Sequence, residues 1–238
     1  MAGGAYTALS GLRTRQEQLD RVAADLANVN TAGYKSERVT TIAAERADFS
    51  RALQSAVDVT PGPGRLDMRS GMITPTGREL DFALEGGGFF TVETPQGVRY
   101  TRNGQFDRRA DGTLVTTDGM AVMGQNGPIR LARGAITVED DGTIRTGATV
   151  AGKLKVVDFG DYTGLRREEN GRFNAVAGQP QDAKTPVKNA SLEQSNASVV
   201  DRMVMLTEVR RGFEGLQRGL TVLMNDIDGR AITELSRR

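Results

Sequence analysis

The residue types that most often carry out chemistry in proteins are scarce in this sequence. The chain has 238 residues and contains neither histidine nor cysteine. Their absence excludes Ser-His-Asp and Cys-His catalysis, disulfide bonds and iron–sulfur clusters, and it removes the usual ligands of zinc. We therefore expect no catalytic residue, no metal site and no cofactor, and we do not expect an enzyme.

One acidic run could still bind a cation or act on a sugar. Glu139, Asp140 and Asp141 are consecutive and precede Gly142. A glycosidase needs two carboxylates on opposite sides of its substrate, and calcium needs several oxygen ligands. Because an Asp-Gly pair between two strands is typical of a hairpin, the sequence favours a turn at this position.

Two further patterns could bind phosphate or nucleic acid. The run at 86–90 is rich in glycine, but it lacks the spacing of a phosphate loop and no helix follows it, so a turn or bulge before a strand is expected. Arginine pairs occur at 108–109, 166–167 and 210–211. Because the net charge is only +1 and no aromatic residues interleave with the pairs, we expect solvated or inter-subunit surfaces and no nucleic-acid binding.

Both ends of the chain have the periodicity of long helices. Between Ala5 and Asn28 there is no proline and leucine recurs every seven residues, and after Ser195 a second apolar stripe has the same spacing. This spacing is typical of coiled coils. The stripe residues, which we expect to form an assembly interface, are Leu12, Leu19, Leu26, Val199, Leu206, Phe213, Leu220 and Ile227.

Neither predicted helix can bury its stripe alone, so we expect the two termini to pair. Apolar residues such as Met203, Val204 and Val222 lie off the stripe, and a two-helix hairpin would leave them in water. They favour additional helices from other subunits. A hairpin in a monomer is the alternative, and it would explain the stripes themselves.

The middle of the chain has the pattern of an antiparallel β domain. Its short apolar segments are separated by pairs typical of type I′ turns, namely Asn103-Gly104, Asp111-Gly112, Asp118-Gly119, Asn126-Gly127, Asp141-Gly142 and Asn170-Gly171. We therefore expect an α+β fold. Residues 1–35 and 195–238 would form a discontinuous helical, coiled-coil domain, 36–76 a linker, and 77–194 an inserted all-antiparallel β domain.

Three separated motifs resemble those of the bacterial flagellar rod and hook proteins. The first closes the N-terminal helix and contains Asn28, Asn30, Thr31, Gly33, Tyr34 and Lys35. The second comprises 88–90, 99–104 and 111–115, and the third comprises 192–196 with Met203, Arg211 and Phe213. The departures from the family pattern are small: Ala32 replaces a usual proline, Asp25 a common asparagine, and Ala197-Ser198 a usual Val-Asn or Val-Asp pair.

The resemblance implies a structural subunit of the flagellar rod, the drive shaft that crosses the periplasm. It implies that the terminal helices pack with those of neighbours into a tube around the export channel, with the β domain outside. The implied partners are further copies, other rod proteins and the flagellar type III export apparatus, without nucleic acid or a membrane span. Residues 1–10 lack the pattern of a Sec signal peptide, which fits this export route.

Within that family, the modest length and the segment 41–69 favour the proximal-rod type over the distal-rod type. Two other classes of protein remain open as alternatives. A periplasmic carbohydrate-active domain on a helical stalk would need converging carboxylates, whereas the acids here fall mainly at predicted turns and on helices. A trimeric adhesin-like stalk would normally have one continuous run of heptads.

Overall fold

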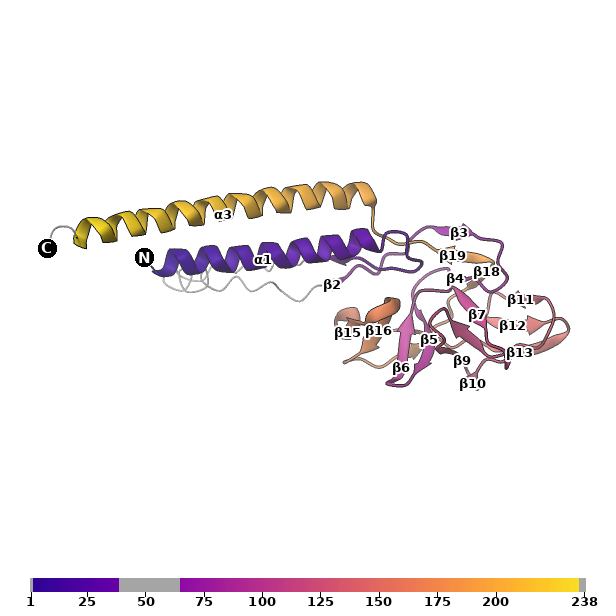
Figure 1. Cartoon of the computed structure of the whole chain (residues 1–238). Helices are drawn as coiled ribbons and strands as arrows, with labels where there is room; N and C mark the ends of the chain where they lie inside the picture. Colours follow the sequence, from indigo (N-terminus) through magenta and orange to yellow (C-terminus); the bar gives the residue numbers. More distant parts are fainter. Residues whose placement is uncertain (1, 39–64, 236–238) are drawn as a thin grey trace. The chain divides into compact units, whose positions relative to one another are not determined.

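The computed structural model describes residues 2–38 and 65–235 (Figure 1). The chain divides into two compact units. The first, which we call the helical unit, contains the helices α1 (Ala2–Ala27) and α3 (Val199–Leu235). The second, the β unit, comprises residues 28–36 and 66–198. The short strands β1 (Glu37–Arg38) and β2 (Arg65–Leu66) pair with each other.

The two helices lie side by side and run antiparallel (Figure 1). The guanidinium of Arg202 lies 3.3 Å from the carboxylate of Asp25, and a Cβ on Gly11 would lie 3.5 Å from Leu216 Cδ1. Between these two contacts the numbering falls by 14 along α1 (25 to 11) and rises by 14 along α3 (202 to 216). The helices therefore keep one register along their shared length.

Each helix buries one valine deeply, Val22 on α1 and Val209 on α3. The acidic Asp201 lies in the first turn of α3, where the helix dipole favours a negative charge. None of the helices in the described part of the chain is long and apolar enough to cross a membrane.

The β unit contains one large sheet and three smaller ones, and every strand pair with a described register is antiparallel. The large sheet has the order β15-β16-β6-β5-β9-β8-β7, with β10, β14 and β17 attached to it. Its strands are β5 (Phe89–Thr94), β6 (Gly97–Thr101), β7 (Phe106–Arg108), β8 (Leu114–Thr116), β9 (Ala121–Gly124), β10 (Gly127–Pro128), β14 (Val156–Asp158), β15 (Leu165–Arg167), β16 (Arg172–Ala175) and β17 (Gln181–Asp182).

The smaller sheets close the β unit around its core. β11 (Ile136–Val138), β12 (Thr143–Thr146) and β13 (Thr149–Lys153) form one sheet, and β3 (Ile73–Pro75) pairs with β19 (Ser191–Glu193). The last sheet pairs β4 (Phe82–Leu84) with β18 (Val187–Asn189). Two 3-10 turns, Tyr162–Gly164 and Glu169–Gly171, flank β15. Strands from the beginning and the end of the β unit are thus paired with each other.

Aromatic side chains form the centre of two buried clusters in the β unit. In the larger one Phe90 and Phe82 both pack on Phe106, with ring centroids 5.3 and 5.7 Å away. In the smaller one Phe89 packs edge-on against Phe173 at 5.4 Å. The observed elements and sheets confirm the predicted α+β fold with two helices and a large antiparallel β domain.

The tight turns follow the predicted positions, but most do not have the predicted geometry. A type I′ turn needs positive φ at both central residues, and Asn170-Gly171 has it, with φ of 59° and 68°. In Asp111-Gly112 and Asp141-Gly142 only the glycine has positive φ. The type I′ prediction is therefore wrong for these pairs.

The reason lies in the aspartate side chains. Oδ1 of Asp111 accepts the backbone N–H of Thr113 at 2.9 Å, and Asp141 does the same for Thr143. The Gly112 N–H donates back to the carbonyl of Arg109 at 2.9 Å. This arrangement is a type I turn followed by a glycine bulge, the geometry that a side-chain bond to the second following residue stabilises.

Gly104 is needed for a different reason from the turn glycines, since its φ is not positive. A Cβ on this residue would lie 1.7 Å from the carbonyl oxygen of Phe82, and the backbone N–H of Phe82 donates to the carbonyl of Gly104 at 3.0 Å. The glycine therefore allows two backbone segments to approach each other at the edge of the larger aromatic cluster.

We predict that Gly104→Ala destabilises the β unit by about 3 kcal/mol, because the clash involves backbone atoms that no side-chain rotation can relieve. Gly160→Ala is the matched control, since a Cβ there meets nothing within 4 Å and its φ is not positive. Urea unfolding monitored by circular dichroism measures both. Equal midpoints for the two variants would contradict the close approach.

Candidate functional site: a buried ionic junction

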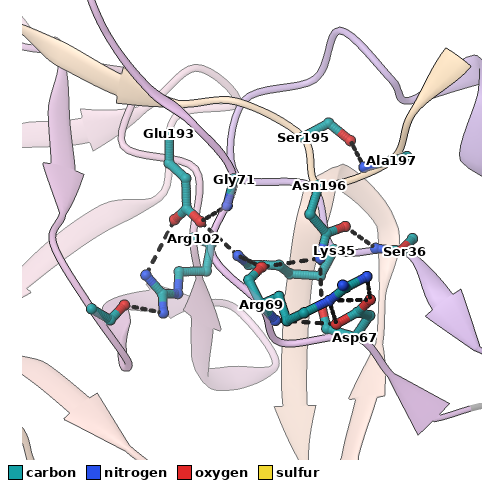
Figure 2. Close-up of polar contacts among 11 residues, drawn as sticks. Lys35, Ser36, Asp67, Arg69, Gly71, Arg102, Glu193, Ser195, Asn196 and Ala197 are labelled. Atoms are coloured by element: carbon teal, nitrogen blue, oxygen red, sulfur yellow. Dashed lines mark hydrogen bonds and ion pairs between the residues drawn. The ribbon is translucent and has the colours of Figure 1, made fainter.

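Three charged side chains from distant parts of the chain meet inside the β unit. Lys35 Nζ lies 2.6 Å from Glu193 Oε1, and Arg102 Nη1 lies 3.2 Å from Glu193 Oε2. All three side chains are almost fully buried, with at most 1% of each exposed. Figure 2 shows the carboxylate between the two cations. We call this cluster the ionic junction.

Backbone groups add three hydrogen bonds to the junction, while Nε of Arg102 is buried without a hydrogen-bond partner. Gly71 N donates to Glu193 Oε1 at 2.9 Å, Lys35 Nζ donates to the carbonyl of Arg69 at 2.9 Å, and Arg102 Nη2 donates to the carbonyl of Gly86 at 2.6 Å (Figure 2). The glycine-rich run before β5 therefore supplies a carbonyl to a guanidinium, and it has the predicted place before a strand.

Burial disfavours the charged forms of Lys35 and Arg102, and the carboxylate of Glu193 favours them. Loss of water lowers the pKa of Lys35 and that of Arg102, while the carboxylate of Glu193 opposes the shift in both groups. Asp67 also favours the charged form of Lys35, and Asp158 favours that of Arg102. A buried cation needs such compensation, because an unpaired charge in the protein interior is strongly destabilising.

The motif after α1 is fixed against the β unit beside the junction. Gly33 has φ of 68°, its N–H donates to the carbonyl of Glu193 at 2.7 Å, and a Cβ would lie 2.3 Å from the backbone of Arg102. The guanidinium of Arg167 stacks 4.4 Å over the ring of Tyr34 and donates to its hydroxyl at 2.8 Å. Only glycine fits at position 33, and the contacts with Arg167 hold Tyr34 in place.

Asn196 joins the motif before α3 to the same place. Its Oδ1 accepts the backbone N–H of Ser36 at 2.8 Å, and its Nδ2 donates to the carbonyls of Asp67 and Arg69 at 2.6 and 3.1 Å (Figure 2). The segments that follow α1 and precede α3 are therefore held by the same small group of residues. The charged side chains of the junction are buried and paired with one another, and the arrangement is suited to holding chain segments in place.

The rest of the first motif forms the turn after α1. The N–H of Thr31 donates to the carbonyl of Asn28 at 3.0 Å, and its hydroxyl donates to the Asn28 side chain at 3.2 Å, while Asn30 is exposed. The sequence identifies Lys35 as a motif residue without predicting a role for it, and it predicts no role for Arg102 or Glu193. The signal that could have identified these three residues is that each is a charged residue inside one of the three motifs.

The predicted stripe residues lie on the two helices, and most of them keep part of their surface in water. Those half-buried are Leu12, Leu19, Leu26, Leu206, Phe213 and Leu220, whereas Val199 is exposed. Ile227 lies within α3, and its side chain lies outside the described residues. The structure therefore leaves the predicted assembly interface as a proposal.

The acidic run is used in a turn, as predicted, between β11 and β12. Glu139 pairs with Arg145, and Asp141 pairs with Lys153 at 2.9 Å. The hydrogen bonds from Lys153 and Thr143 lower the pKa of the Asp141 carboxyl to about 2. In the part of the chain that the structure describes, no group of three acidic residues is placed to hold a metal ion.

The chain is similar to known proteins over most of its length. Residues 6–35 match the family model described as flagella basal body rod protein, and residues 83–148 match the flagellar hook protein FlgE/F/G D1 domain. The flagellar basal-body rod protein FlgG of Bacillus subtilis is 31% identical, with 91% of this chain and 93% of the relative covered. FlgF of Caulobacter vibrioides is 31% identical with 92% of each covered, and FlgF of Escherichia coli is 33% identical with 97% of each covered.

We predict that Glu193→Gln destabilises the β unit by about 3 kcal/mol, because it removes the charge that compensates two buried cations while keeping the size of the side chain. Thermal melting followed by circular dichroism measures the loss. Glu139→Gln removes the same charge from an exposed pair and should cost at most about 1 kcal/mol. The idea fails if the two variants melt at the same temperature.

Proposed function

This chain belongs to the flagellar basal-body rod protein family and is a structural subunit of the bacterial flagellar rod, and we propose that it polymerises through α1 and α3 to transmit torque. In this proposal the helical unit mediates assembly, and the β unit is attached to it. Its main support is the apolar surface that the paired helices leave uncovered.

The first turns of α3 expose several large apolar side chains. Val200, Met203 and Val204 expose 70%, 53% and 54% of their surface. Their spacing puts them on one face of the helix, because residues three and four apart are neighbours there. Such a patch on one chain favours burial against another subunit. We infer that helices of neighbouring copies or of other rod proteins cover it.

The heptad stripe would contribute a second part of the same interface. Leu206, Phe213 and Leu220 are only half-buried, so each keeps apolar surface that a neighbour can cover. We propose that these helices and their neighbours pack as a coiled-coil tube around the export channel, with the β unit outside. In this scheme residues 1–35 and 195–238 act as one discontinuous assembly domain, in which 28–35 and 195–198 are the ends that belong to the β unit.

The remaining parts of the proposal follow from family membership. The subunit would reach the periplasmic part of the basal body through the flagellar type III export apparatus. Its partners would be further copies and other rod proteins. It would have no enzymatic activity, since its relatives carry the names of flagellar basal-body rod proteins.

Within the family we assign the chain to the FlgF type, with the FlgG type as the alternative. Relatives of both types have similar identity to this chain, so the assignment is based on the sequence of the segment 41–69. Expression in strains that lack either protein tests it. Rescue of rod formation only in the strain that lacks FlgG would overturn the assignment.

We predict that Val204→Asp and the double variant Phe213→Ala/Leu220→Asp block rod assembly while the β unit still folds. A buried Phe→Ala change removes roughly 3–5 kcal/mol, and the loss repeats at every subunit contact. Motility and imaging of basal bodies measure assembly, and thermal melting of the purified chain measures the β unit.

Gln217→Asp is the matched control, because it adds the same charge at an exposed polar position of α3. Cells with this control should swim. Normal rods in cells with either test variant would show that these faces are not assembly interfaces. Unfolding of the β unit in the test variants would show that the two units are not independent.

A further inference from the structure

A cluster of arginines surrounds an open hollow on the β unit, far along the chain from the ionic junction residues Lys35 and Glu193. The hollow has a volume of about 420 Å³ and is lined by residues 108–112 and 131–133. Four exposed arginines belong to these segments or lie next to them, namely Arg108, Arg109, Arg130 and Arg133. We call this feature the arginine hollow.

The backbone that carries the arginines is firmly held. Arg109 N donates to the carbonyl of Thr113 at 2.9 Å across the β7–β8 turn, and Leu131 N donates to the carbonyl of Gly112 at 2.8 Å. A Cβ on Gly112 would lie 2.7 Å from the Leu131 carbonyl oxygen, so the turn packs closely against the segment 131–133. The hollow is therefore built on fixed backbone.

Several surface arginines of the β unit lie beside carboxylates. Arg99 lies 2.7 Å from Glu168, and Arg78 lies 2.9 Å from Asp107. In contrast, among the residues that the structure describes, no carboxylate lies within ion-pair distance of any of the four arginines of the hollow. The guanidinium of Arg108 donates to the carbonyl of Ala132 at 3.1 Å, and that of Arg109 donates to the carbonyl of Gly119 at 2.5 Å.

We propose that the arginine hollow is a docking site for the acidic surface of a neighbouring protein subunit of the rod, one that presents paired carboxylates. Guanidinium groups bind carboxylates through two parallel hydrogen bonds, and arginine is enriched in protein interfaces while lysine is depleted. This inference rests on the proposed function, because it needs neighbours in an assembly.

The composition of the hollow favours a protein over an extended polyanion. Asp111 lies among the arginines, and its pKa is lowered chiefly by the backbone N–H of Thr113, with help from Arg109 and Arg130. The ionised carboxylate would repel a polymer of like charge, whereas a protein surface can offer it a cation. The small residues Ala110 and Ala132 leave space for side chains from a partner.

The test uses the full chain assembled into rods, with a photoreactive amino acid in place of the exposed Ala132. Cross-linked peptides are identified by mass spectrometry, and the yield is compared after adding Arg108→Glu and Arg133→Glu together. We expect a cross-link to an acidic peptide of a rod subunit, and charge reversal should lower its yield about tenfold. Arg166→Glu is the control, since Arg166 is an exposed arginine of β15 outside the hollow, and it should leave the yield unchanged.

The outcomes separate this inference from the proposed function. If the chain is present in purified rods but cross-links only to a glycan, or to no rod protein, the arginine hollow is not a protein docking site. An unchanged yield after charge reversal also overturns the inference. If the chain itself is missing from rods although it is expressed and folded, the proposed function fails instead.

Discussion

The β unit depends on the compensation of buried charge. Lys35 and Arg102 lie in the interior, where an ammonium and a guanidinium lose their water, and the carboxylate of Glu193 contacts both. Burial lowers the pKa of each cation, and Glu193 opposes that shift. Because these groups come from the segment after α1, from the end of β6 and from the segment before α3, the charge is compensated only when all three chain regions are in place.

This requirement brings together the two chain segments at which the β unit begins and ends. The chain enters the β unit from α1 and leaves it toward α3 through segments that share one set of hydrogen bonds, with Asn196 bonded to Ser36 and Gly33 bonded to Glu193. Glycine makes the close approach possible, since a Cβ on Gly71 would lie 1.9 Å from the carbonyl of Gln194. A structural subunit needs fixed chain geometry more than it needs chemistry, and we infer that the ionic junction provides that geometry.

Much of the local structure could be predicted from the sequence, because periodicity and turn pairs are local signals. The helices, the strands near Phe82 and Phe89, and the turn at Asp141-Gly142 are where they were expected. The type I′ geometry was wrong because the Asp111 and Asp141 side chains select another turn. The ionic junction was beyond such reasoning: Lys35 and Glu193 are 158 positions apart, and no spacing rule connects them. Only their membership of the family motifs pointed to them.

The central claim is that Lys35 and Glu193 stabilise the β unit through each other. A double-mutant cycle tests it most directly, with the free energy of unfolding measured for the unmodified chain, Lys35→Met, Glu193→Gln and the double variant. We predict that the double variant loses about 2 kcal/mol less than the sum of the single losses, because Glu193→Gln leaves the buried charge of Lys35 without its carboxylate, and Lys35→Met leaves Glu193 with only one of its two cations. Losses that add within about 0.5 kcal/mol would contradict the account, because Lys35 and Glu193 would then contribute to stability independently of each other.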